Sequence, residues 1–196
     1  LSCAVIGTTW GIQGRTFDGS SLINIDSVLP SLASATTGTF EVWVKLPDTT
    51  PASNSDFIGF GDASALELII FRIRATGFLE FNCYKAGVQQ WTLRTTVAPL
   101  TDDVFHHLFA VQDGVSPVIY VDNSAPAQAF TDQTDKTAWF SNLAGLDTGR
   151  MGCANYDNNG NIEFLTGTEG EVRIYTRALS SAEKQHNYLA TKWRYQ

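Results

Sequence analysis

The sequence predicts an all-β fold, a two-sheet antiparallel sandwich with one short C-terminal helix. Short runs of alternating apolar and polar residues recur about every 8 to 12 residues, and turn-forming pairs such as Asp18-Gly19 and Asp113-Gly114 separate them. Clear helical periodicity appears only after Ser180, near the end of the chain. Many short strands followed by a single helix are typical of a sandwich rather than of a parallel α/β fold.

Two segments show the strand pattern most clearly. In residues 39–46 the apolar side chains alternate with Glu41, Trp43 and Lys45, so one face is predicted to be core and the other polar with one aromatic ring. In residues 171–175 the sequence EVRIY alternates in the same way. Both strands, with residues 105–112, are predicted to supply deeply buried core side chains: Phe40, Val42, Val44, Phe109, Val111, Val172 and Ile174.

The terminal helix has a recognisable start. Either Ser180 or Ser181 can cap its N-terminus, and Glu183 can reach back to complete a capping box. Tyr188, Leu189 and Trp193 lie at helical spacing and are predicted to form its apolar face.

Composition limits the kind of protein that this can be. A length of 196 residues with 43% hydrophobic content suits one core, so residues 1–196 are expected to form a single domain. The net charge of −7 argues against binding to nucleic acid or to an anionic membrane, because both need a basic face. No apolar run is long enough for membrane insertion. The abundant small polar residues favour an extracellular or surface-displayed protein. Because the sequence starts at Leu1 and its single methionine is Met151, we expect it to be part of a larger or processed protein.

Residues that often catalyse or bind metals are scattered along the chain. Cys3, Cys83 and Cys153 lack metal-ligand spacing, and at most one disulfide can form, between a pair that the sequence does not select. The alternative is that all three are small buried hydrophobes. His106 and His107 are adjacent in a predicted strand, and we expect packing roles rather than catalysis for them.

Five segments share their chemistry and their order with one known family. They are TFDGSSLINI (residues 16–25), GTFEVWVKLP (38–47), FHHLFAVQDG (105–114), IYVDN (119–123) and GTEGEVRIYTRALSSAEKQHNYLATKW (167–193). In these segments the chain resembles the laminin-G-like, concanavalin A-like family. The resemblance spans about residues 14–193 and implies a concanavalin A-like jelly roll. That fold hosts lectins, enzymes, receptors and structural spacers, so it does not select a function.

Enzymatic motifs of this fold are incomplete in the chain. The E-x-D-x-x-E strand of laminarinase-type hydrolases is missing, and Glu67 and Glu80 stand alone, which favours solvent-facing or rim positions for them. Residues 84–90 (YKAGVQQ) resemble a strand of jelly-roll alginate lyases, but the partner strands of those enzymes are missing. We therefore interpret YKAGVQQ as a hairpin with a glycine turn and predict a protein without hydrolase or lyase activity.

The segment NYDNNGNIE (residues 155–163) is the best candidate for a metal site. It places Asp157, Asn159, Asn161 and Glu163 at alternate positions, and their oxygens are the donors that Ca²⁺ prefers. Glycine falls at the fourth position, so the loop is not an EF-hand, and the competing interpretation is a plain turn. Calcium is predicted, if bound here, on Asp157, Asn161 and Glu163.

A ligand site is expected where three loops meet at one rim of the sandwich. The loops are residues 61–64, 131–141 and 155–163. Together they offer aromatic rings, amides and a carboxylate, the groups that bind sugar hydroxyls. The predicted ligand-binding residues are Asp62, Trp139, Tyr156 and Asn159.

These expectations favour a non-catalytic extracellular module for carbohydrate binding or adhesion, with a glycan or surface glycoprotein as partner. The alternative is a structural, decoration or tail-fibre element of a virus particle or other surface assembly, in contact with neighbouring subunits. A lectin needs one concave cluster of rings and amides, whereas an assembly element needs a broad apolar patch. A glycan lyase or hydrolase is the third possibility.

Overall fold

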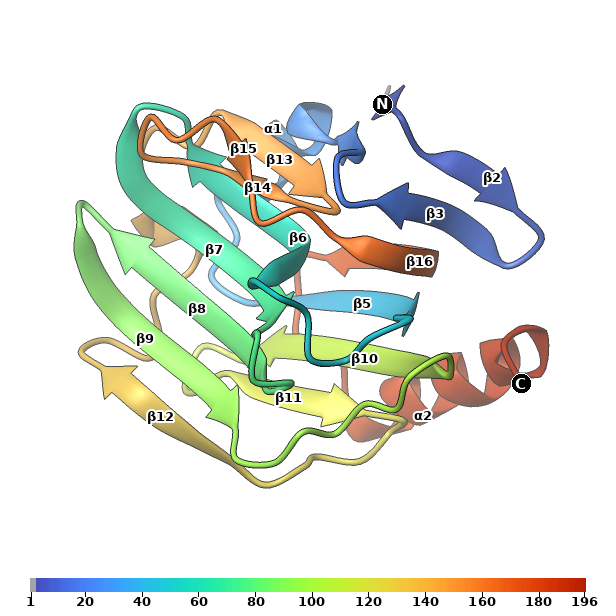
Figure 1. Cartoon of the computed structure of the whole chain (residues 1–196). Helices are drawn as coiled ribbons and strands as arrows, with labels where there is room; N and C mark the ends of the chain where they lie inside the picture. Colours follow the sequence, from blue (N-terminus) through green and yellow to red (C-terminus); the bar gives the residue numbers. More distant parts are fainter. Residues whose placement is uncertain (1–2) are drawn as a thin grey trace.

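The computed structural model describes residues 3–196, and it confirms the antiparallel two-sheet sandwich (Figure 1). One sheet has eight strands in the order β1-β4-β13-β6-β7-β8-β9-β12. Their bounds are β1 Ala4–Ile6, β4 Leu22–Asn24, β13 Thr148–Met151, β6 Ser55–Asp62, β7 Ala65–Ile73, β8 Leu79–Lys85, β9 Val88–Thr95 and β12 Gln128–Gln133.

The opposing sheet has six strands in the order β11-β10-β5-β16-β3-β2. Their bounds are β11 Val118–Val121, β10 Phe105–Gln112, β5 Gly38–Lys45, β16 Thr166–Tyr175, β3 Gly14–Asp18 and β2 Thr9–Gly11. A separate pair, β14 (Ala154–Asn155) and β15 (Asn161–Ile162), lies over β6. The helices are α1 (Leu29–Leu32) and α2 (Ser181–Thr191), and no helix within residues 3–196 is long and apolar enough to cross a membrane.

The core between the sheets is organised around Phe40 on β5. Its ring centroid lies 5.7 Å from that of Phe60 and 5.8 Å from that of Phe81, which both come from the eight-stranded sheet. The ring of Trp139 approaches Phe40 to 5.4 Å. Rings at these separations and tilts add to the stabilisation that burial alone provides. The predicted alternation of β5 is confirmed, because Phe40, Val42 and Val44 belong to the core between the sheets, whereas Trp43 belongs to a separate cluster.

The outer face of the six-stranded sheet is covered by α2 (Figure 1). Trp43 of β5 stacks on His107 and Tyr195, with ring centroids 4.5 Å apart in both cases, and Tyr188 of α2 packs beside it. The indole N–H of Trp43 donates to Thr191 at 2.9 Å. The face predicted to be polar with one aromatic ring is therefore a second, smaller core beneath the helix.

The start of α2 follows the prediction. Ser180 is the N-cap, its hydroxyl accepts from the Glu183 amide at 3.3 Å, and Glu183 accepts from the Ser180 amide at 2.9 Å. Such reciprocal bonds satisfy amide groups that have no partner inside the helix. The predicted apolar face is wrong in part, because the side chains of Leu189 and Trp193 are 51% and 73% exposed.

Two further burial predictions are corrected. Val172 and Ile174 are half-buried rather than deeply buried, because they lie where the two sheets diverge next to the short strands β1 and β4. All three cysteines are free thiols; Cys83 and Cys153 are buried as expected, whereas Cys3 is exposed.

Val42 and Val172 form a matched pair for testing this difference, because they are cross-strand neighbours on β5 and β16. Val42→Ala removes two methyl groups from a fully buried site and should lower the free energy of unfolding by about 2 kcal/mol. Val172→Ala should cost about half of that or less, since water already reaches its side chain. Urea unfolding of both variants measures the difference, and equal losses would contradict the open position of Val172.

Glu169 on β16 is a carboxyl group inside the core. It pairs with Val44 across the sheet, is fully buried, and neither of its side-chain oxygens has a hydrogen-bond partner among the described residues. Burial raises the pKa of this carboxyl group well above its ordinary value of 4.5. The environment therefore favours the neutral acid.

The raised pKa of Glu169 makes stability depend on pH. The folded state holds this proton more tightly than the unfolded chain, so the free energy of unfolding should fall as pH rises from the ordinary pKa through the folded one. Glu169→Gln stays neutral and should shrink the stability difference between about pH 5 and about pH 8, measured by urea unfolding. Glu183→Gln is the control, because hydrogen bonding to Arg177 holds the pKa of Glu183 at about 2; it should leave that difference unchanged.

Candidate functional site

A polar hollow lies on the outer face of the eight-stranded sheet, over β7, β8 and β9. Its volume is about 220 Å³. Side chains at alternate positions of adjacent antiparallel strands point to the same face, and here that face gathers three arginines with amide, phenol and carboxyl groups. The lining residues are Leu66, Leu68, Arg72, Arg74, Glu80, Asn82, Tyr84, Gln89, Arg94 and Tyr156. This set is called the arginine pocket below.

Glu80 holds the arginine pocket together. Its Oε2 atom accepts from Arg74 at 2.8 Å and also from the Nε–H group of Arg94, while its Oε1 accepts from Asn82 at 3.0 Å. Burial opposes ionisation of Glu80, but the attraction of Arg72 and the hydrogen bond from Arg94 outweigh it, so its pKa is lowered. Glu80 is therefore a carboxylate that fixes two guanidinium groups in place.

Arg74 and Arg94 are the exposed cations of the arginine pocket. Their side chains are 30% and 32% exposed, whereas that of Glu80 is 2% exposed. Their bonds to Glu80 use Nη1 of Arg74 and Nε of Arg94, so these two pocket-lining residues keep further N–H groups for a ligand. A guanidinium presents its donors as a planar fork that matches a carboxylate. The arrangement can therefore bind an anionic group between the two arginines.

Arg72 forms the buried base of the arginine pocket. It donates to Glu163 at 2.9 Å, and its Nε atom lies 3.2 Å from Asp56 and 3.6 Å from Glu80. Asp56 is fully buried, and burial raises its pKa well above the usual range although Arg72 opposes the shift. Three guanidiniums therefore meet the three carboxyl groups of Asp56, Glu80 and Glu163 in and beneath the arginine pocket.

One wall of the arginine pocket comes from the β14–β15 segment. This segment can lie on β6 because two residues of β6 are glycines: a Cβ on Gly59 would lie 2.8 Å from Cβ of Ala154, and one on Gly61 would overlap the Asn155 carbonyl. Tyr156 then packs against Leu68 and Ile70 of β7. Burial and the nearby Glu163 raise the pKa of Tyr156 to about 12, so its hydroxyl remains a donor at neutral pH.

Two of the three predicted rim loops meet. The Asp157 amide donates to the Asp62 carbonyl at 3.1 Å, and the Asn158 amide donates to the Ala63 carbonyl at 2.7 Å. The predicted ligand residues, however, do not form one cluster. The Asp62 carboxylate accepts from the hydroxyl and the amide of Ser64 at 2.8 Å, and Tyr156 alone of the four lines the arginine pocket.

The other predicted ligand residues lie elsewhere. Trp139 is 1% exposed and packs in the core, so its predicted role as an exposed sugar-stacking ring is wrong. Its place there depends on Gly38, where a Cβ would lie 2.7 Å from the indole nitrogen. Asn159 is exposed, and its side-chain amide donates to the Tyr156 carbonyl at 3.2 Å. A sugar contact at Asp62 or Asn159 stays a prediction.

Two of the three predicted calcium ligands have hydrogen-bond partners within the protein. Asn161 accepts from Nε of Arg150 at 3.2 Å, and Glu163 is bound by Arg72 and by Asn54, both at 2.9 Å. Within residues 3–196, no three His, Cys, Asp or Glu side chains are grouped as a metal site. Calcium binding itself stays a prediction, to be tested by calorimetric titration.

Glu67 and Glu80 are not the solvent-facing or rim carboxylates that the sequence favoured. Both are buried; Glu67 accepts from the Ala144 amide at 2.6 Å. YKAGVQQ does form the expected hairpin, with Ala86 and Gly87 in a left-handed turn at φ values of 48° and 77°. Sequence reasoning set this hairpin aside as a plain turn, yet Tyr84 and Gln89 on its two strands line the arginine pocket.

The two histidines have structural contacts away from the arginine pocket. Nδ1 of His106 lies 2.8 Å from Asp122, and Nε2 of His107 lies 3.0 Å from Glu41. The expectation of packing roles is confirmed, because His107 is fully buried against Trp43.

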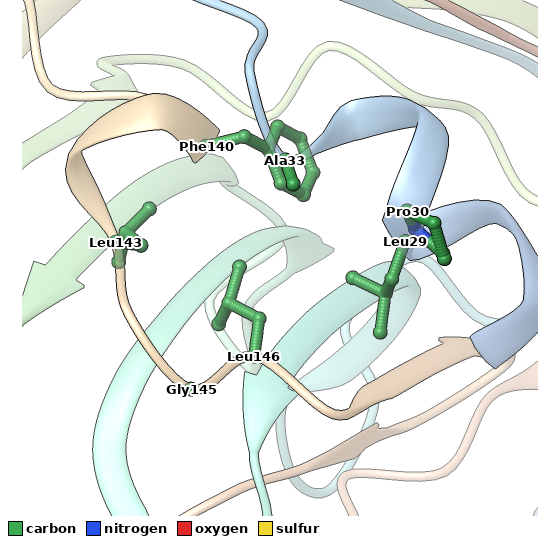
Figure 2. A pocket seen from close by; sticks show the side chains of 7 residues that line it. All are labelled: Leu29, Pro30, Ala33, Phe140, Leu143, Gly145 and Leu146. Carbon is green, nitrogen blue, oxygen red and sulfur yellow. The ribbon is translucent and has the colours of Figure 1, made fainter.

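A second hollow, of about 240 Å³, lies between α1 and the segment before β13. Figure 2 shows its lining, in which Leu29, Phe140 and Leu146 are prominent. No polar side chain lines it, so it has nothing with which to orient sugar hydroxyls. The arginine pocket is the better candidate for a polar ligand.

A protein-family model matches most of this chain. The family model described as the concanavalin A-like lectin/glucanases superfamily, of the laminin G type, matches residues 17–183. The chain belongs to this superfamily. The concanavalin A-like fold predicted from the sequence is thereby confirmed. A search of curated proteins finds no match.

Solved structures of similar shape include carbohydrate-binding modules. The CBM40 of the Ruminococcus gnavus IT-sialidase, bound to α2,3-sialyllactose, has a TM-score of 0.69 at 14% identity, over 96% of this chain and 97% of that one. NanB sialidase from Streptococcus pneumoniae has a TM-score of 0.74 at 19% identity, and the match covers 88% of this chain and 27% of the sialidase. Leech intramolecular trans-sialidase has a TM-score of 0.70 at 17% identity, and the match covers 95% of this chain and 27% of the enzyme. This concanavalin A-like chain thus spans about a quarter of the length of each of the two sialidases. At these sequence identities, the structural similarity shows the fold alone.

Gly61→Ala tests the close approach that builds the wall of the pocket. The added methyl group has to displace the backbone at Asn155 and Tyr156, so we expect a loss of about 1 to 3 kcal/mol in the free energy of unfolding. Gly11→Ala is the matched control, since its nearest contact would be an ordinary 3.5 Å. Urea unfolding of both compares them, and an unaffected Gly61→Ala protein would show that the wall is not held against β6.

Proposed function

We propose that this chain is a non-catalytic carbohydrate-binding module that binds an acidic sugar in the arginine pocket. The observation that carries the proposal is the pair of partly exposed guanidiniums of Arg74 and Arg94, which are both held by Oε2 of Glu80. A sugar carboxylate can accept from both arginines, while Tyr84 and Gln89 can bond to ring hydroxyls. The CBM40 neighbour bound to sialyllactose supports this choice of ligand.

The same contacts argue for binding rather than catalysis. Glycoside hydrolysis needs one carboxyl group that keeps its proton and a second that stays ionised. Glu80 has a lowered pKa and is bound by two arginines, and Glu163 is bound by Arg72. Asp56 has a raised pKa, but it is fully buried and does not line the pocket, so a glycan there would not reach it. No histidine lines the pocket to shuttle protons. We therefore propose that the carboxylates position the arginines and do not act on the glycan.

As a glycan-binding module, the chain would act in a secreted or surface-displayed protein, with a surface glycoprotein as its partner. The proposed contacts require no metal ion. They differ in this respect from a site in which calcium bridges protein and sugar.

The proposal predicts that the binding affinity depends strongly on the carboxylate of the sugar. Calorimetric titration should show that α2,3-sialyllactose binds and that lactose binds at least about tenfold more weakly, because a charged hydrogen bond is lost. Arg94→Gln should weaken sialyllactose binding by about tenfold or more, and Arg94→Lys, which keeps the charge without the fork, should lie between.

Arg177→Gln is the control, because Arg177 pairs with Glu183 at α2, away from the arginine pocket. The Arg177→Gln protein should bind sialyllactose as tightly as the parent protein does. Adding a metal chelator should leave the affinity of the parent protein for sialyllactose unchanged. Equal binding of lactose and sialyllactose would remove the role given to the arginines. Release of sugar from sialyllactose by the parent protein would contradict the non-catalytic assignment.

A further inference from the structure

Arg15 on β3 stands apart from the other arginines. Within residues 3–196, every other arginine has a carboxylate within 4 Å: Arg72, Arg74, Arg94, Arg150, Arg173, Arg177 and Arg194. Arg15 has no such partner among the described residues. Its guanidinium carbon instead lies 4.2 Å from the ring centroid of Trp10, which faces it across the β2–β3 pair.

Arg15 borders a groove of about 500 Å³ where the two sheets diverge. One side of the groove comes from the eight-stranded sheet and the other from β2, β3 and β16 of the six-stranded sheet. Its principal apolar lining residues are Val5, Ile23, Met151, Trp10, Val172 and Ile174. Arg15 is the only charged residue in the lining. This groove is called the Arg15 groove below.

The Arg15 groove has the size and chemistry of a ligand site. Small-molecule sites commonly have volumes of about 300 to 1,000 Å³ and apolar walls with few polar groups. Trp10 and Val5 are 75% and 43% exposed, so apolar surface faces water here. A neutral apolar ligand would cover that surface but leave the cation unpaired, and a sugar would find one charged donor instead of several polar partners.

We propose that the Arg15 groove binds a monomeric amphiphile with one carboxylate head and an unbranched apolar chain. The head accepts hydrogen bonds from Arg15, whose contact with Trp10 holds the guanidinium at the rim. The chain lies between the two sheets, against Ile23 on one side and Val172 and Ile174 on the other. Charge complementarity selects the anion, and the apolar lining selects its chain.

This site is independent of the proposed glycan site. The arginine pocket lies on the outer face of β7, β8 and β9, and the two sites share no residue. Failure of one proposal leaves the other in place.

Decanoate, decanol and decyltrimethylammonium, each below its micellar concentration, are the probes. Calorimetric titration of the full chain should show saturable one-site binding of decanoate, with binding of the cationic probe weaker by about tenfold or more. Arg15→Gln should weaken decanoate binding by about tenfold and leave decanol binding unchanged. Val5→Ser, at a partly exposed edge position, should weaken both.

Arg177→Gln serves again as the control and should bind decanoate as the parent does. Circular dichroism checks that each variant is folded. The proposal is overturned if the parent shows no saturable binding of decanoate, or if Arg15→Gln binds it as tightly as the parent. It is also overturned if the protein binds phosphatidylglycerol vesicles but not monomeric decanoate, since the groove would then be part of a membrane-binding surface.

Discussion

Three guanidinium groups share one small hollow of this sandwich because a buried carboxylate lies among them. Without Glu80, the like charges of Arg72, Arg74 and Arg94 would repel one another in surroundings that water screens poorly. Glu80 is itself kept ionised by those arginines. The fixed guanidinium groups of the proposed ligand site follow from this mutual dependence.

The fold was accessible from the sequence where a short-range pattern determines the structure. Phe40, Val42 and Val44 occupy the core because a strand side chain can face only one of two sides. Ser180 and Glu183 cap α2 because their spacing alone permits the reciprocal bonds. The position of Trp139 was predicted wrongly because it depends on a long-range contact and not on a short-range pattern. Its turn-rich segment suggests exposure, and the space that buries it is provided by Gly38, which is distant in the sequence.

The arginine pocket was missed because its members come from three strands and look isolated along the chain. A signal was present, since Arg72 on β7 and Arg74, just after its end, lie two residues apart, and Glu80, Asn82 and Tyr84 alternate on β8. Pairing those strands as consecutive hairpins would have placed the five side chains on one face. Tyr156 was predicted as a ligand residue and does line the pocket, but the interaction of Glu163 with Arg72 depends on a contact that no local spacing encodes.

Alternation along β7 and β8 has a consequence for how this protein can diversify. The charged side chains of the arginine pocket on these strands are flanked by residues that face the core, with Phe71 and Ile73 beside Arg72, and Leu79 and Phe81 beside Glu80. Mutations at these positions can therefore change the chemistry of the arginine pocket without altering inter-sheet packing, provided that the charges remain balanced. Residues that shape the pocket and residues that stabilise the core therefore occupy alternate positions of the same strands, so that they can be substituted separately.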